Sequence, residues 1–137
     1  MFQNPPDSVI REILSGSRTI AVVGCSPKEY RDSHMVARFL IQRGHSVTPV
    51  NPGHRNILGL TCYRDLLSLP EPVEMVDVFR RSEYVPDIID QAIQIGAKVV
   101  WTQLGVYHEE AAAKALTAGL TVVMNRCPVI EYRRLGL

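Results

Sequence analysis

The chain has 137 residues, of which 46% are hydrophobic and 21% are charged, and its formal net charge is +1. This length and composition are ordinary for one globular domain with its own core, so we expect a single domain over residues 1–137. A charge this close to zero gives no overall field for nucleic acid or an anionic membrane, and we expect neither as a partner.

Short apolar runs rich in β-branched residues alternate along the chain with segments of helical periodicity. The pattern predicts strands over residues 19–24, 46–50, 73–79, 97–101 and 120–124, and helices over 8–14, 33–43, 84–95 and 108–118. A loop covers 51–59, a short helical turn or loop 63–69, and an irregular or helical tail 128–135. Asp7 and Ser33 occupy N-cap positions, Met35 belongs to an inward-facing stripe, and Pro49 suggests a strand end or edge.

This alternation predicts an α/β fold: a Rossmann-like, doubly wound, five-stranded parallel sheet in three layers, with right-handed crossovers. We expect the strand order 3-2-1-4-5. Ligands of such sheets bind beyond the carboxyl ends of the strands, where the strand order reverses. In that order the reversal lies between the ends of the first and fourth strands, near Gly24 and Trp101.

The segment after the first strand has features of a phosphate-binding loop. Gly24 permits a tight turn, Ser26 offers a hydroxyl, and Arg31 suits a phosphate, ahead of a helix whose first amide groups are free. The second and third glycines of GxGxxG are absent. An ordinary strand-to-helix loop with solvated charges explains the segment equally well.

The end of the second strand lacks the carboxylate that NAD sites place there for the ribose hydroxyls. His54 and Arg55 follow instead. They suit a ribose with an extra phosphate, as in NADP or coenzyme A, and a solvated loop is the alternative. At the other strand ends, Phe79 suits either an adenine or the core, Trp101 favours the core, and Gln103 favours a cleft.

Together these segments resemble the small CoA-binding proteins that are similar to the N-terminal domain of the succinyl-CoA synthetase α subunit. The resemblance rests on residues 21–27, 31–34, 49–52, 76–80, 101–105 and 125–128. It implies that Gly24, Ser26 and Pro27 approach the pyrophosphate of coenzyme A, flanked by Arg31, Ser33 and His34, and Cys25 of the same loop is counted among the binding residues. It also implies that Val50, Asn51 and Pro52 border the adenosine, and that Phe79, Arg80, Trp101, Gln103 and Gly105 line the rest of the cleft.

One departure from the family pattern concerns the 3′-phosphate of coenzyme A. Many relatives carry Lys or Arg directly after the Asn-Pro pair, where this chain has Gly53. His54 or Arg55 is the candidate substitute. If neither reaches the ligand, NADP-like or dephospho ligands become more plausible.

Three functions remain open. The first is a module that binds coenzyme A or acyl-CoA, a small-molecule ligand, without catalysis. The second is a thiol or redox protein that uses Cys25 with coenzyme A, since a thiol beside free amide groups and Arg31 has a lowered pKa. The third is a small NAD(P)-binding oxidoreductase. The sequence indicates no catalytic set, metal site or protein partner.

The cysteines and the N-terminal residues indicate the cellular compartment of the protein. Cys25, Cys62 and Cys127 are odd in number and widely spaced, which favours reduced thiols. The first residues lack the pattern of a signal peptide, and no apolar stretch approaches the length of a membrane span. We therefore expect a cytoplasmic protein.

Overall fold

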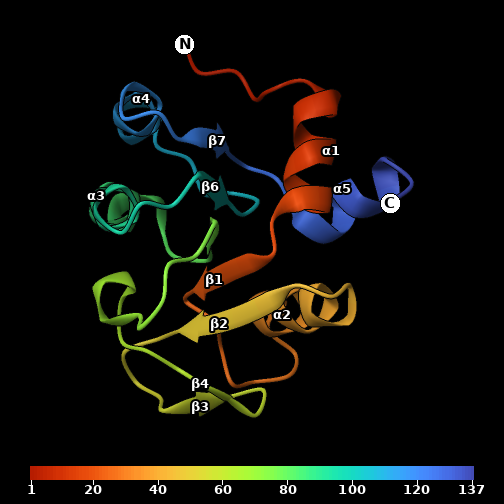
Figure 1. Cartoon of the computed structure of the whole chain (residues 1–137), viewed down its shortest axis with the longest axis vertical. Coiled ribbons are helices and arrows are strands. Elements are labelled where there is room, and N and C mark those ends of the chain that lie inside the picture. Colours follow the sequence, from red (N-terminus) through yellow and green to blue (C-terminus); the bar gives the residue numbers. More distant parts are fainter.

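The computed structural model describes residues 1–137 and contains a five-stranded parallel sheet with helices on both faces (Figure 1). The strands of this sheet are β1 (Thr19–Val23), β2 (Ser46–Val50), β5 (Met75–Val78), β6 (Val99–Thr102) and β7 (Thr121–Val123). The helices are α1 (Asp7–Gly16), α2 (Asp32–Gln42), α3 (Val85–Gln94), α4 (Glu109–Thr117) and α5 (Pro128–Arg134), with short 3₁₀ turns η1 (Leu66–Ser68) and η2 (Ser82–Tyr84). The α/β, Rossmann-like, three-layer fold is confirmed.

The strand order is β2-β1-β5-β6-β7, which is 2-1-3-4-5 for the five parallel strands. The predicted order 3-2-1-4-5 is wrong, because alternation of strands and helices does not fix on which side of the first strand the third one pairs. The strand order therefore reverses between β1 and β5, beside Gly24 and Phe79, rather than between β1 and β6. The prediction from Pro49 is confirmed, since β2 is an edge strand.

Two apolar clusters flank the sheet. Along β1, Ala21 and Val23 belong to the cluster under α3 and α4, whereas Ile20 and Val22 belong to the cluster under α1, α2 and α5. Figure 1 shows the two groups of helices on opposite sides of the strands. Burial on both faces explains why the strands read as continuous apolar runs.

Several local predictions were wrong. The helix N-caps are Pro6 and Arg31, while Asp7 and Ser33 lie inside the first turns of α1 and α2. Asp7 pairs with Arg134 of α5. Met35 is 49% exposed rather than buried. The expected loop over 51–59 contains β3 (Asn56–Ile57), which pairs with β4 (Leu60–Thr61) in a hairpin. None of the helices has the length and apolar character that crossing a membrane requires.

Candidate functional site

Gly24 sits at the point where the strand order reverses. Its φ of +84° is unfavourable for any residue with a side chain. A Cβ at this position would lie 2.6 Å from the carbonyl oxygen of Phe79. The Gly24 amide also donates to the carbonyl of Val50 at 2.8 Å. Glycine therefore allows the carboxyl ends of β2, β1 and β5 to converge.

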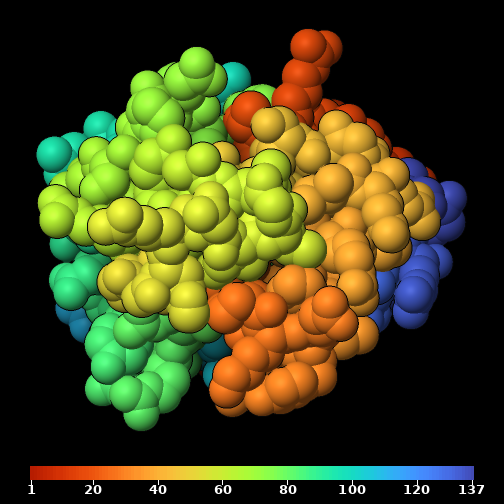
Figure 2. Space-filling view, turned by 90° about the horizontal axis from the view of Figure 1, so that it is seen from below, coloured from red at the N-terminus to blue at the C-terminus, as the bar shows by residue number.

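A cavity of about 470 Å³, the switch-point cavity, opens beyond these strand ends. Its lining residues come from the loop after β1, the start of α2, and the segments after β2 and β5. They are Gly24, Ser26, Pro27, Lys28, Arg31, Asp32, Ser33, Asn51, His54 and Phe79. Figure 2 views this side of the molecule, with a gap between the orange segment after β1 and the green segment after β5.

Hydrogen bonds fix the shape of the loop after β1. The Ser26 amide donates to Oγ of Ser33 at 2.9 Å, and the Ser26 carbonyl accepts from Nδ1 of His34 at 2.9 Å. Asn51 donates through Nδ2 to the carbonyl of Cys25 at 2.9 Å, which ties the loop to the end of β2. Ser33 and His34 are buried. Their side chains hold the loop in place rather than facing the cavity freely.

The switch-point cavity is suited to an anion. Lys28, Arg31 and His54 line it, and none of them forms an ion pair within the chain. The amide groups of Asp32 and Ser33, in the first turn of α2, have no acceptor within the chain. Free amides at the start of a helix and cationic side chains together favour phosphate groups. Asp32 is the single carboxylate in the lining.

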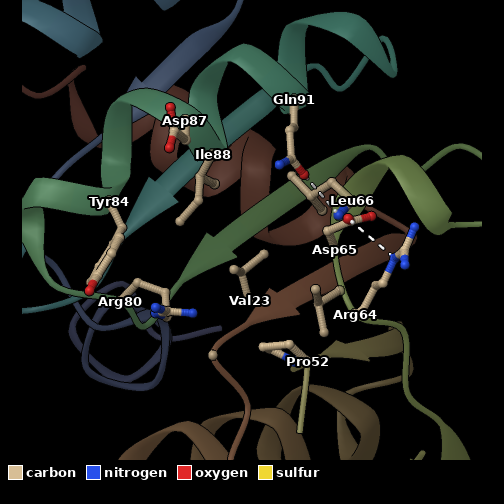
Figure 3. Close-up of a pocket in the computed structure, with 12 residues that line it drawn as sticks. Val23, Pro52, Arg64, Asp65, Leu66, Arg80, Tyr84, Asp87, Ile88 and Gln91 are labelled. Carbon is tan, nitrogen blue, oxygen red and sulfur yellow. Dashed lines mark hydrogen bonds and ion pairs between the residues drawn. The ribbon is translucent and has the colours of Figure 1, made fainter. Parts of the chain in front are cut away.

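A second, smaller cavity of about 160 Å³ meets the first at Gly24 and lies against α3. We call it the α3 cavity, and Figure 3 shows its residues. Val23 and Val50 give it an apolar side, while Asp87 and Gln91 line it from α3. Oε1 of Gln91 accepts from the amide of Leu66 at 3.1 Å, which leaves the NH₂ group of Gln91 without a partner. Apolar walls with a few polar groups are typical of small-molecule sites, and at this volume the α3 cavity has room for only part of such a ligand.

The structure brings most of the predicted site residues to these two cavities. Gly24, Ser26, Pro27, Arg31, Ser33, Asn51 and Phe79 line the switch-point cavity, and Val50, Pro52 and Arg80 line the α3 cavity. Cys25, His34, Trp101 and Gly105 line neither, and Gln103 lines a separate groove. His54 is at the switch-point cavity whereas Arg55 is not.

Two predicted residues are core residues in the structure. Trp101 is fully buried, and its Nε1 donates to the carbonyl of Arg126 at 2.9 Å. Cys25 is also fully buried, and this burial, with smaller contributions from Cys62 and Asp77, raises the pKa of its thiol to about 12. A reactive thiol needs the opposite shift, so this environment gives no support to redox chemistry at Cys25.

Some lining residues were absent from the predicted set. Lys28 and Asp32 belong to the loop and helix start that the sequence singled out, but they were not chosen. Tyr84, Asp87 and Gln91 line the α3 cavity from one face of the third helical segment. Their spacing of three and four residues was a usable signal, because it places polar groups on one side of a helix that follows a strand end.

The fold and the cavities define a Rossmann-like α/β domain with a cationic site where its strand order reverses. The family model of the CoA binding domain matches residues 18–133, and the chain belongs to this family.

The chain is also similar to individual proteins and solved structures. The chain is 39% identical over 131 residues to the uncharacterized protein YneT of Bacillus subtilis (strain 168), covering 96% of this chain and 97% of YneT. A solved structure titled as a hypothetical protein from Pyrococcus horikoshii OT3 superimposes with a TM-score of 0.93 at 42% identity, with both chains fully covered. Acetate–CoA ligase [ADP-forming] I subunit alpha of Pyrococcus furiosus is 30% identical over 95 residues, which are 65% of this chain but 21% of that subunit.

Proposed function

We propose that this chain binds coenzyme A at the carboxyl edge of its sheet and acts as a binding module without catalysis of its own. The observation that carries the proposal is the switch-point cavity, where Lys28, Arg31 and His54 are unpaired in a chain of the CoA binding domain family. Its ligand is a small molecule with several phosphate groups. A single domain over residues 1–137 accounts for the site, since strands of the five-stranded sheet and the loops and helices around them line both cavities.

The cationic residues match the phosphates of coenzyme A. Arg31 offers a planar fork of donors to the pyrophosphate, and the free amides of Asp32 and Ser33 add further donors. His54 follows Gly53 in the loop after β2 and lines the switch-point cavity, and we assign it to the ribose 3′-phosphate.

The α3 cavity receives the adenine. The ring lies against Val23 and Val50, and the Asp87 carboxylate accepts from the adenine amino group. The NH₂ group of Gln91 is available for a ring nitrogen. Because the two cavities meet at Gly24, a single ligand can place its adenine in one cavity and its pyrophosphate in the other.

Calorimetric titration of matched variants with coenzyme A tests the assignment. We expect Arg31→Ala to weaken binding by roughly tenfold to a hundredfold, as for the loss of a hydrogen bond to a charged group. Lys98→Ala removes an equal charge directly before β6, at the opposite end of the sheet, and is expected to leave the affinity unchanged. Equal effects of the two substitutions would show that overall charge, rather than this cavity, governs binding.

A further inference from the structure

A third hollow of about 370 Å³ runs between α2 and α5, and we call it the α2–α5 groove. Its walls are mostly apolar. Met35, Phe39, Leu104, Val129 and Ile130 belong to its apolar lining, and Gln103 lines it as well. Met35 and Ile130 are each 49% exposed and Leu104 is 52% exposed, so large apolar side chains meet solvent along this groove.

Gln103 marks the end of the groove nearest the sheet. It directly follows β6, and the residue is only 8% exposed. Oε1 of its carboxamide is buried and has no hydrogen-bond partner. Buried acceptors without a partner are rare in native proteins and are costly for the folded state. Because this oxygen is buried, an N–H or O–H donor of a ligand in the groove would satisfy it once the Gln103 carboxamide turns toward the groove.

The groove continues the switch-point cavity along the sheet. Asp32 lines both hollows. Asn51, Gly24 and Phe79 mark the ends of β2, β1 and β5 in the first hollow, and Gln103 marks the end of the neighbouring β6 in the second. Adjacent strands are about 4.8 Å apart, so an elongated ligand can pass from one hollow to the next along this edge.

We propose that the α2–α5 groove holds the acyl group of an acyl-CoA thioester, so that this chain selects acylated coenzyme A over the free thiol. The inference rests on the proposed binding of coenzyme A. With the pyrophosphate in the switch-point cavity, the pantetheine arm runs along the sheet edge, and one of its amide N–H groups donates to Oε1 of Gln103. The acyl group then lies on Met35, Phe39 and Val129.

The length and surface of the groove favour an aliphatic chain. Its α2 wall extends from Asp32 to Gln42, which at a helical rise of 1.5 Å per residue corresponds to about 15 Å. The free thiol of coenzyme A would leave most of this apolar surface in contact with water. An acyl chain would cover it, and each buried methylene strengthens binding by about fourfold.

Titration of the wild-type chain with coenzyme A and with its acetyl, butyryl and octanoyl thioesters tests this inference. We expect affinity to rise with chain length, with octanoyl-CoA binding at least tenfold tighter than coenzyme A. Ile130→Trp fills the groove and should abolish this preference. Leu116→Trp on α4 starts from the same 49% exposure and should retain it.

A ligand without the pantetheine arm separates this inference from the proposed function. Gln103→Leu removes the unpaired acceptor and should weaken coenzyme A and octanoyl-CoA by about fivefold each. It should leave adenosine 3′,5′-bisphosphate unaffected. Equal affinities of coenzyme A and octanoyl-CoA for the wild-type chain would overturn the acyl groove while coenzyme A binding stood. Failure of every one of these ligands to bind would overturn both.

Discussion

Replacing Gly24 with alanine tests whether the convergence of three strand ends depends on the missing side chain. Two costs are expected in the folded state. The first comes from the backbone, since φ of +84° in the left-handed region costs a residue with a Cβ about 1–2 kcal/mol. The second comes from the new methyl group, which would lie 2.6 Å from the Phe79 carbonyl oxygen and 3.0 Å from Cδ of Arg80.

The movement of a flexible side chain cannot relieve this second cost. The nearest atom belongs to the backbone at the end of β5, where the Phe79 amide is held by the Val23 carbonyl at 2.8 Å. Relief of the contact requires β1 and β5 to separate at their ends. Overpacking of this kind costs typically 1–3 kcal/mol, so we expect Gly24→Ala to lower the free energy of unfolding by about 2–5 kcal/mol.

Gly44→Ala is the matched control. Gly44 has a similar φ of +93°, but nothing lies within 4 Å of the position its Cβ would take. It therefore reports the backbone cost alone, about 1–2 kcal/mol. Urea unfolding of both variants, followed by circular dichroism, measures the difference. Equal losses of stability would refute the argument, because they would show that the approach of Phe79 to Gly24 imposes no cost of its own.

Two further predictions concern buried titratable groups. Asp77 is fully buried without a hydrogen-bond partner, and burial raises the pKa of its carboxyl group well above the ordinary value of 3.8. The carboxyl group therefore stays protonated to a higher pH in the folded state than in the unfolded state. The free energy of unfolding should consequently fall by about 1.4 kcal/mol per pH unit as pH rises from about 4 toward the folded-state pKa, and urea titrations of Asp77→Asn should lack this component. With a pKa of about 12, Cys25 should resist iodoacetamide at pH 8 in the native chain and react once the chain is unfolded in urea. Native labelling of Cys25 as fast as in urea, detected by peptide mass spectrometry, would contradict the buried thiol.

Periodicity was sufficient to predict the elements of the fold but not their arrangement in the sheet. Short runs rich in β-branched residues identified all five parallel strands, and the edge strand β2, with Ser46 and Thr48, mixes polar with apolar positions along its length. The side of β1 on which β5 pairs depends on long-range packing, which leaves no periodic mark in either strand. The error affected one strand only. The strand order reverses beside Gly24 at the end of β1, as predicted, but the strand on the other side of the reversal is β5 rather than β6.

The same limit applies to the candidate site. Gly24, Ser26 and Arg31 could be placed from the sequence because they follow directly from the end of β1. Whether Cys25 and Trp101 face a cavity or the core depends on side-chain direction at the strand ends, which the sequence leaves open. Ser33 illustrates a different difficulty, because its hydroxyl accepts from the Ser26 amide in the preceding loop instead of capping α2, which begins at Asp32.

The central claim is that the carboxyl edge of the sheet binds coenzyme A, and calorimetric titration of the reduced wild-type chain tests it most directly. Coenzyme A, dephospho-CoA and NAD should be titrated under the same conditions. We predict saturable binding of coenzyme A, weaker binding of dephospho-CoA because it lacks the phosphate assigned to His54, and still weaker binding of NAD. Absence of coenzyme A binding, or NAD binding of equal affinity, would contradict the claim.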